Sequence, residues 1–280
     1  MLLIIGKESL IGSALLQIAE ENAISCVGTS RRAGEQWFLD LAMPPATWRI
    51  PPQATTAIIC AARTKLSDCE ADPDQSRAIN VTATVETARR LTDQGCRVVF
   101  LSTNQVFSPI LSAPPDESTP VSPANEYGRQ KAEAEVAILG LSPKNVVIRL
   151  TKVIHDTLNL FQDWMHKLSK NAPITPYDDL FLAPVSSNLA ANAILQICLS
   201  EKVGFFHISS RDAISYKDLA KNLASIHGVD TNLVQAMRAP VPNSANSCTL
   251  ACPRTLRAIG FKAPFSQDSI NEVFHTQNPV

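Results

Sequence analysis

Short apolar runs alternate with helical patterns through the first half of the chain. Runs rich in Ile, Val and Leu lie at residues 2–5, 24–29, 57–61, 98–101 and 146–150, and helical patterns begin near residues 11, 78 and 127. Strands separated by helices require crossover connections, so these runs predict a parallel sheet with helices on both faces. Burial on both faces also explains why the runs are continuous rather than alternating with polar residues. This half therefore predicts a doubly wound α/β fold.

The second half of the chain has a different pattern. Prolines interrupt its first part, residues 204–210 form an apolar strand pattern, and residues 215–227 place apolar side chains on one helical face. These short segments predict a smaller C-terminal lobe that is interleaved with the end of the sheet. We therefore divide the chain into a larger α/β unit over residues 1–155 and a smaller lobe over residues 156–280.

The charges and cysteines narrow the class of protein. With 25 Lys and Arg against 26 Asp and Glu, the net charge of -1 gives no long-range attraction to a nucleic acid. The seven cysteines are scattered, as is typical of a reducing compartment, and Cys248 and Cys252 lack the second pair that a zinc site needs. The apolar start is interrupted by Gly6, Lys7 and Glu8, which favours a strand and a helix over a signal peptide. We expect a cytoplasmic protein with no metal, nucleic-acid or membrane partner.

A glycine-containing turn follows the first apolar run. Gly6, Ser9 and Gly12 give the pattern G-x-x-S-x-x-G between a strand and a helix. In a Rossmann-type dinucleotide-binding fold, Gly6 would make the tight turn and Gly12 the close contact between helix and strand, while Ser9 stands where a third glycine is usual. The turn, including Leu10 and Ile11, would present backbone N–H groups to a pyrophosphate at the positive end of the helix. An ordinary structural turn is the alternative.

Two arginines follow the second apolar run. Ser30, Arg31 and Arg32 occupy the place where an NAD-specific protein carries an acidic residue for the ribose 2′-hydroxyl. A guanidinium group suits a 2′-phosphate instead, so this segment predicts NADP(H) as the cofactor, with Arg31 favoured over Arg32 as the phosphate ligand. The alternative is that both arginines belong to a solvated loop.

Two further segments lie where cofactor contacts are expected. Asp40 and Leu41 follow a short segment at the position of a residue pair that brackets an adenine ring, although a surface aspartate is a rival interpretation. The third apolar run ends in the small residues Cys60, Ala61 and Ala62, as is needed where the backbone lies against a bound cofactor. Both segments are therefore predicted to bind the cofactor.

Three side chains at the end of a strand and the start of a helix form a candidate catalytic group. Thr103 follows the fourth run, and Tyr127 and Lys131 lie four residues apart on one helical face. A tyrosine with a pKa near 10 is a poor acid at neutral pH, but a nearby cation lowers that pKa. We expect Tyr127 to donate a proton to a substrate oxygen, Thr103 to hydrogen-bond the same oxygen, and Lys131 to hold a ribose. A chance Tyr–Lys pair on an exposed helix is the alternative.

Several segments together resemble one enzyme family. They are CAARTKLSDCEADPDQSRAINVTAT at residues 60–84, LSTNQVFS at 101–108, PPDESTPVSPANEYGRQKAEAE at 114–135 and, more loosely, APVSSNLAANAI at 183–194 and GFFHISSRDAISYKDLAKNLA at 204–224. On these segments the chain resembles an extended short-chain dehydrogenase/reductase of the dTDP-4-dehydrorhamnose reductase branch. The resemblance implies a Rossmann-type sheet with a smaller C-terminal substrate-binding lobe.

The resemblance also implies a reaction and its residues. Enzymes of this branch use NADPH to reduce the keto group of a nucleotide-linked sugar. By position, Thr103, Tyr127 and Lys131 would be the catalytic residues, and Asn80 and Ser102 would contact the cofactor. A homodimer is common among relatives.

The chain departs from the family pattern near the expected substrate pocket. Asn104 and Gln105 replace an acidic residue and a tyrosine beside the catalytic group, and Arg63 stands where an aromatic residue is usual. These three residues are therefore the candidate substrate contacts. Arg149, next to the sheet edge, is interpreted as one member of a structural ion pair.

Two other functions are compatible with the same scaffold. A nucleotide-sugar epimerase or dehydratase would keep NAD tightly bound and return the hydride, but the two arginines disfavour NAD, and a dehydratase needs an acid and a base after Thr103. A non-catalytic NADP-binding regulatory subunit would not need to retain Thr103, Tyr127 and Lys131 together.

Overall fold

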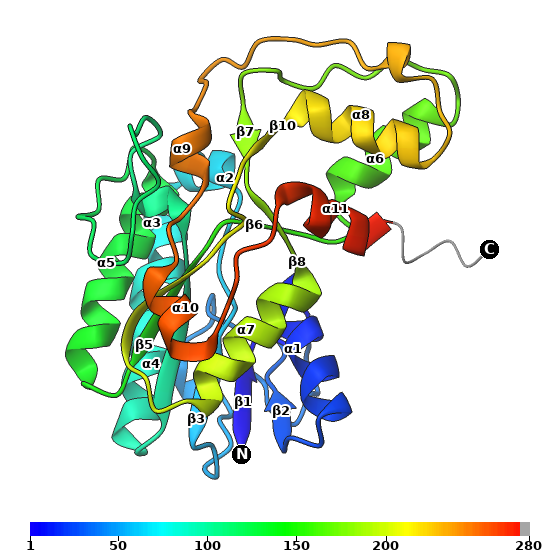
Figure 1. Cartoon of the computed structure of the whole chain (residues 1–280). Coiled ribbons are helices and arrows are strands. Elements are labelled where there is room, and N and C mark those ends of the chain that lie inside the picture. The colour runs from blue at the N-terminus through cyan, green and yellow to red at the C-terminus, as the bar shows by residue number, and fades with distance from the viewer. Residues whose placement is uncertain (275–280) are drawn as a thin grey trace.

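A six-stranded parallel sheet forms the centre of the computed structural model, which describes residues 1–274 (Figure 1). The strands lie in the order β2-β1-β3-β4-β5-β9. Their bounds are Leu2–Ile5 for β1, Cys26–Gly28 for β2, Thr56–Ile59 for β3, Arg97–Thr103 for β4, Val146–Leu150 for β5 and Gly204–Ile208 for β9. Because β2 and β3 lie on opposite sides of β1, the order reverses at β1. Parallel sheets bind ligands in the crevice at such a point, outside the carboxyl ends of the strands.

Helices cover both faces of the sheet. On one face lie α1 (Leu10–Glu21) and α7 (Ser187–Leu199), and on the other lie the π-helix η2 (Ala78–Ala83), α4 (Thr84–Asp93) and α5 (Glu126–Leu141). Residues Leu2 and Ile4 of β1 are buried with α1 and α7. Their neighbours Leu3 and Ile5 are buried with α4 and α5. This burial on both faces confirms the doubly wound α/β fold.

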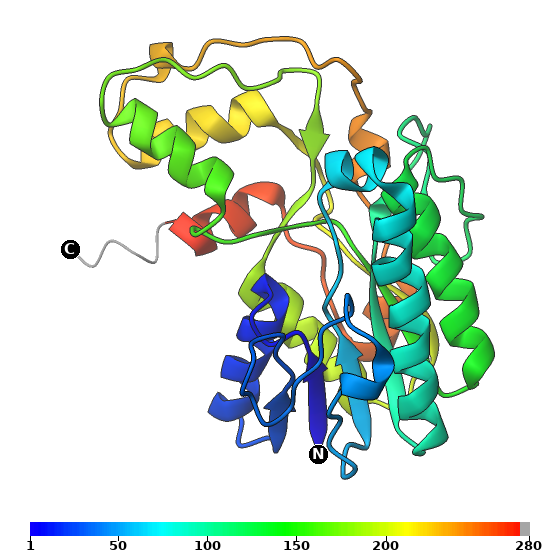
Figure 2. The same cartoon turned by 180° about the vertical axis from the view of Figure 1, so that it is seen from behind.

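A smaller lobe lies beyond the carboxyl edge of the sheet (Figures 1 and 2). It contains α6 (Asn159–Leu168), α8 (Tyr216–Ile226), the antiparallel pair of β7 (Phe181–Leu182) and β10 (Ile214–Ser215), and the short helix η4 (Thr231–Leu233). Its apolar side chains share a core with α11 (Ser266–Phe274). The parallel pair of β6 (Lys152–Ile154) and β8 (Pro184–Ser186) connects this lobe to the sheet.

Short helices complete the described chain. They are η1 (Pro45–Thr47), α2 (Leu66–Ala71), α3 (Pro73–Arg77), η3 (Asn104–Val106), α9 (Ala245–Cys248) and α10 (Pro253–Ile259). Within residues 1–274, no helix has both the length and the apolar character needed to cross a bilayer.

Some elements differ in detail from the sequence-based expectation. The helix predicted near residue 78 is divided into η2 and α4, because a π-helical turn is inserted at its start. The strand predicted at residues 204–210 is β9, which pairs with β5 in the central sheet. The sheet therefore takes its last strand from the second half of the chain, and a division near residue 155 stays a prediction.

Candidate active site

The turn after β1 has the close packing that a dinucleotide-binding turn needs. Gly6 has a φ of +92°, a region that favours glycine, and its N–H donates to Thr29 Oγ1 at 3.1 Å. A Cβ on Gly12 would lie 2.3 Å from the Gly6 carbonyl oxygen, so no side chain fits there. A Cβ on Gly6 would lie 3.0 Å from Ala61 Cβ, just after β3. The turn and the end of β3 therefore meet closely at the point where the strand order reverses.

Ser9 has a role in the turn that the motif alone did not predict. Its hydroxyl donates to the Gly6 carbonyl oxygen (2.8 Å) and accepts from Gly12 N (3.1 Å), so it caps α1 rather than projecting toward a ligand. The first helical hydrogen bond runs from Ser13 N to the Ser9 carbonyl oxygen. The N–H groups of Leu10 and Ile11 precede that bond and are the groups left for an anion at the helix start.

Arg31 and Arg32 lie in the exposed segment after β2. Ser30 is buried, and its hydroxyl accepts a hydrogen bond from Arg32 N (3.0 Å). Arg32 Nε lies 4.0 Å from Glu8 Oε1, whereas Arg31 has no acidic partner among residues 1–274. Arg31 is therefore the freer guanidinium group at the carboxyl end of β2.

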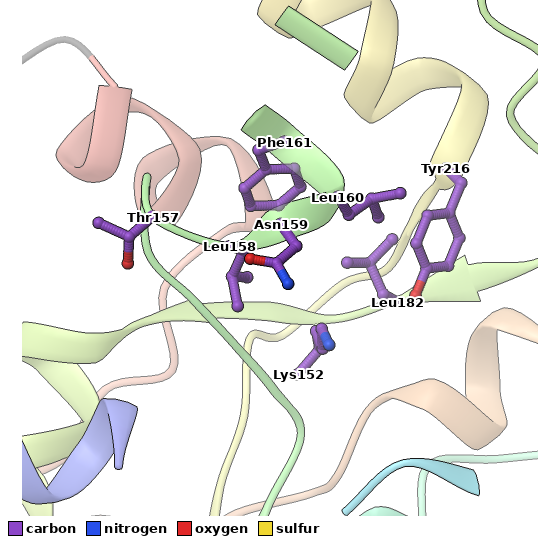
Figure 3. Close-up of a pocket in the computed structure, with 8 residues that line it drawn as sticks. All are labelled: Lys152, Thr157, Leu158, Asn159, Leu160, Phe161, Leu182 and Tyr216. Carbon is purple, nitrogen blue, oxygen red and sulfur yellow. The ribbon is translucent and has the colours of Figure 1, made fainter. Parts of the chain in front are cut away.

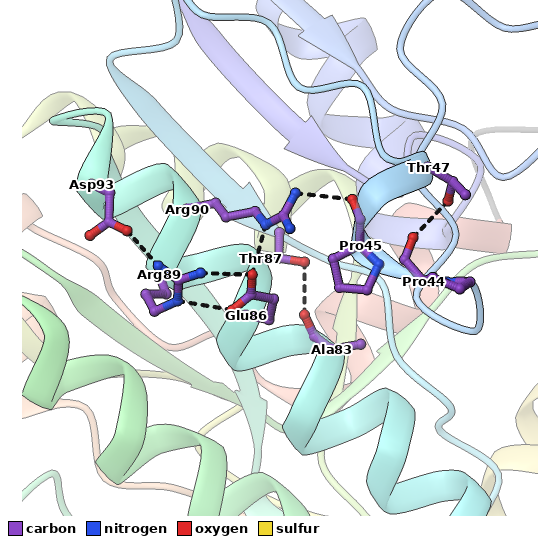
Figure 4. A network of polar contacts seen from close by, with 9 residues as sticks. All are labelled: Pro44, Pro45, Thr47, Ala83, Glu86, Thr87, Arg89, Arg90 and Asp93. Carbon is purple, nitrogen blue, oxygen red and sulfur yellow. Dashed lines mark hydrogen bonds and ion pairs between the residues drawn. The ribbon is translucent and has the colours of Figure 1, made fainter.

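The segment that carries Asp40 and Leu41 is anchored to α4. Trp48 Nε1 donates to the Asp40 carbonyl oxygen (2.8 Å), and Arg90 lies over the Trp48 ring at 5.5 Å from its centre. Arg90 also donates to the carbonyl oxygen of Pro45 at 3.0 Å (Figure 4). These contacts fix the segment in place, and its contact with an adenine ring stays a prediction.

Asn80 holds a loop of the protein itself. Its Oδ1 accepts from Arg63 N (2.8 Å), and its Nδ2 donates to the Arg63 carbonyl oxygen (2.9 Å) and to Gln130 Oε1 (2.8 Å). The buried amide thus ties the loop after β3 to α5. These hydrogen bonds use both ends of the amide, and a contact between Asn80 and the cofactor stays a prediction.

Gln105 positions the start of α5. Its Oε1 accepts from Asn125 Nδ2 (2.8 Å), and Asn125 caps α5 by accepting from Gly128 N (2.8 Å). A Cβ on Gly128 would lie 2.1 Å from the Gln105 carbonyl oxygen, so the loop packs directly on the helix. Thr103 Oγ1 accepts from Gln105 N at 3.2 Å. Gln105, predicted to contact substrate, therefore links the Thr103 loop to α5.

The other predicted substrate residues also contact the protein. Asn104 Nδ2 lies 3.5 Å from the carbonyl oxygens of Ser247 and Cys248, both in α9. Arg63 donates from its guanidinium group to Gln75 Oε1. Asn104 is thus placed between the end of β4 and the C-terminal segment, and substrate contact by either residue stays a prediction.

Lys131 connects α5 to the end of β4. Its Nζ donates to the Leu101 carbonyl oxygen (2.6 Å) and lies 3.7 Å from the centre of the Phe100 ring. Burial lowers the pKa of Lys131 to about 7, although the Glu135 carboxylate and the Cys60 thiol act in the opposite direction. Ser102, predicted to contact the cofactor, lies beside this contact, and its buried hydroxyl has no partner among residues 1–274.

Tyr127 is buried one helical turn before Lys131. Burial raises the pKa of Tyr127 above its usual value, and the Cys69 thiol adds to this increase. The prediction that the Lys131 ammonium lowers this pKa is therefore wrong, because burial dominates and Lys131 directs its ammonium at Leu101. A raised pKa keeps the phenol protonated at neutral pH, which is the state that a proton donor needs.

A buried ion pair lies one turn further along α5. Arg149 of β5 donates to Glu135 from Nη2 to Oε2 (2.7 Å) and from Nε to Oε1 (3.0 Å) and Oε2 (3.3 Å). The guanidinium also stacks on Phe107 and Phe205, at 5.0 and 4.3 Å from the ring centres. The interpretation of Arg149 as a member of a structural ion pair is confirmed.

The lowered pKa of Lys131 predicts how stability depends on pH. Its ordinary value is 10.5 and its folded value is about 7, so between these values the unfolded chain binds the extra proton and stability rises with pH. From pH 7 to 8.5 this group contributes an increase between about 1 and 2 kcal/mol in the free energy of unfolding. Urea unfolding at both pH values should show this increase, and Lys131→Met should remove it. An unchanged increase in the variant would contradict the assignment.

The sequence patterns gave no sign of a cavity of about 330 Å³ between β6, α6, β7 and α8 (Figure 3). Lys152, Thr157, Asn159 and Tyr216 are the lining residues with polar side-chain groups. Lys152 and Asn159 are close in the sequence, but Tyr216 is distant, and only the fold brings it to them.

Comparisons with known proteins agree with this arrangement. The chain matches the family model described as the RmlD substrate binding domain over residues 1–278. It is 24% identical over 245 residues to the probable low-salt glycan biosynthesis reductase Agl14 of Haloferax volcanii, covering 82% of this chain and 81% of that protein. It is 29% identical over 191 residues to a dTDP-4-keto-6-deoxy-D-glucose reductase of Streptomyces niveus, covering 68% and 65%. The crystal structure of dTDP-4-dehydrorhamnose reductase from Bacillus anthracis in complex with NADP has a TM-score of 0.86 at 19% identity, covering 99% and 98%.

The sheet order and the glycine turn define a Rossmann-type α/β protein. Since the family match spans nearly the whole chain, the protein belongs to the RmlD substrate binding domain family, among the dTDP-4-dehydrorhamnose reductase-like members of the extended short-chain dehydrogenases. The resemblance inferred from the motifs is confirmed. Its distant homologues are nucleotide-sugar reductases.

Proposed function

We propose that this protein uses NADPH to reduce a keto group on a nucleotide-linked sugar. The observation that carries the proposal is the contact of Lys131 Nζ with the Leu101 carbonyl oxygen, which holds the first turns of α5 against the end of β4. Thr103 lies two residues beyond Leu101, and Tyr127 lies one helical turn before Lys131. The Gly6 turn follows β1 at the same carboxyl edge, because the strands of the sheet are parallel.

The three side chains have separate roles in this reaction. When bound, NADPH would supply the hydride that reduces the carbonyl carbon. Tyr127 donates its phenolic proton to the carbonyl oxygen, since the alkoxide that develops there is more basic than a phenolate. Thr103 hydrogen-bonds the same oxygen and fixes its position. With the cofactor bound, Lys131 would hold the ribose hydroxyls.

The chain has groups suited to NADP(H) at each part of the crevice. The N–H groups of Leu10 and Ile11 suit the pyrophosphate. Gly12, where no Cβ would fit, allows the start of the helix to lie close to the Gly6 turn. The exposed guanidinium of Arg31 suits the 2′-phosphate, which NAD lacks. These features support NADP(H) over NAD.

Turnover with each cofactor tests both parts of the proposal. With a nucleotide-linked 4-keto sugar, the protein should consume NADPH, seen as loss of its absorbance. Arg31→Ala should raise the KM for NADPH about 10- to 100-fold and leave the KM for NADH unchanged, because only NADPH has a charged group for Arg31 to bind. Arg257→Ala, at an exposed position on α10, is the matched control.

Two results would contradict the proposal. Equal changes in both KM values would mean that Arg31 does not bind the 2′-phosphate. Binding of NADPH without reduction of any keto sugar in a panel would favour a non-catalytic subunit instead.

A further inference from the structure

The cavity between β6, α6, β7 and α8 has one cationic side chain and an otherwise apolar or neutral lining. Lys152 lies beneath Asn159, while Phe161, Leu182 and the ring of Tyr216 form the walls (Figure 3). At about 330 Å³, the space is large enough for a sugar ring or a similar group. Apolar and aromatic walls with a few polar groups are typical of small-molecule sites.

Lys152 has no protein anion to balance it. None of the lining residues is acidic, and no ion pair to Lys152 occurs among residues 1–274. Partial burial lowers the pKa of Lys152, and no neighbouring charge offsets this effect. The Lys152 side chain is exposed, so a ligand anion can reach its ammonium and pair with it.

The cavity lies close to the candidate catalytic group. Leu150 of β5 is in register with Thr103 of β4, and Lys152 is two residues further along the chain. The Cα atom of Lys152 therefore lies within about 12 Å of that of Thr103, because neighbouring strands are about 5 Å apart and two residues span at most about 7 Å. A sugar whose keto oxygen contacts Thr103 can place another of its substituents at Lys152.

We propose that Lys152 binds an anionic oxygen of the substrate and so determines which sugars are accepted. The inference rests on the proposed function, since it takes the molecule in the cavity to be the reductase substrate. Two groups of the substrate carry such an oxygen, namely the pyrophosphate that joins nucleotide and sugar, and a carboxylate on the sugar itself. The apolar walls would then pack against the faces of the sugar ring.

Binding measurements with four probes test this assignment. We choose isothermal titration calorimetry of the full chain with UDP, dTDP, UDP-glucose and UDP-glucuronic acid in the presence of saturating NADP⁺. Lys152→Met keeps the length of the side chain and removes its charge, and should weaken binding about tenfold or more. Lys144→Met, which removes the same charge from an exposed position before β5, should leave binding unchanged.

The pattern across the probes identifies the source of the anionic oxygen. Equal weakening of all four supports pairing with the pyrophosphate. Weakening of UDP-glucuronic acid alone supports pairing with a sugar carboxylate. Unchanged affinities in Lys152→Met, or binding of none of the probes by the wild-type protein, would overturn the assignment. Binding is measured here without turnover, so a failure of the proposed reduction gives a separate result. In that case the probes would still bind in a Lys152-dependent way, but the protein would not consume NADPH.

Discussion

Replacing Tyr127 with phenylalanine is expected to lower kcat about 100- to 10,000-fold, the range over which positioned proton donors act. The substitution removes the hydroxyl and keeps the ring, which is buried at the start of α5. The alkoxide would then have to take its proton from water, while Thr103 still contacts the oxygen. NADPH affinity should stay within about threefold, since the groups proposed to bind its phosphates are unchanged. Steady-state kinetics and NADPH titration measure the two quantities.

A second tyrosine provides the control for this experiment. Tyr177 lies in the lobe and has a backbone bridge with Met237, so Tyr177→Phe makes the same chemical change away from α5. It should retain nearly full activity. If Tyr127→Phe also retained it, Tyr127 would not be the proton donor. If the NADPH affinity and the thermal stability of Tyr127→Phe fell together with its activity, the loss of activity would reflect damage to the fold.

The strands of the central sheet could be predicted because each one is marked by its own short stretch of sequence. Each strand that is buried on both faces is a continuous run of Ile, Val or Leu, so β1 and β5 could be located to the residue. The handedness of the crossovers between parallel strands then follows from a general rule. The lobe was less predictable because its core joins short segments such as α6, α8 and α11, whose contacts are distant in the sequence.

The candidate site likewise combines residues that the sequence indicated with contacts that it did not. Gly6, Gly12, Tyr127 and Lys131 form patterns with fixed spacing, so the sequence indicated them. What a polar side chain bonds to is decided by the packed structure, and no pattern predicts it. The hydrogen bonds of the Asn80 amide to Arg63 and Gln130, for example, were not indicated by any motif.

Removing the carboxylate of Glu135 is expected to destabilise the protein by about 3–5 kcal/mol. Glu135 and Arg149 are both nearly inaccessible to water, with side chains 2% and 3% exposed. In Glu135→Ala the guanidinium would be buried without an anion, and Arg149 Nη1 already lacks a partner among residues 1–274. Urea unfolding of the two proteins at pH 7 measures the difference. Asp93→Ala, which breaks the exposed Arg89–Asp93 pair, should cost less than about 1 kcal/mol.

A double substitution separates the cost of an unpaired charge from the value of the pair itself. In Glu135→Leu with Arg149→Met, neither charge remains, and the thioether introduced on β5 would keep contact with the Phe107 and Phe205 rings. We expect this protein to unfold within about 2 kcal/mol of the wild type, because the desolvation of two ions nearly cancels their attraction. Its catalysis should still suffer, since Glu135 is the neighbour that favours the protonated form of Lys131. A double variant as unstable as Glu135→Ala would instead show that the pair is needed for packing and not for charge balance.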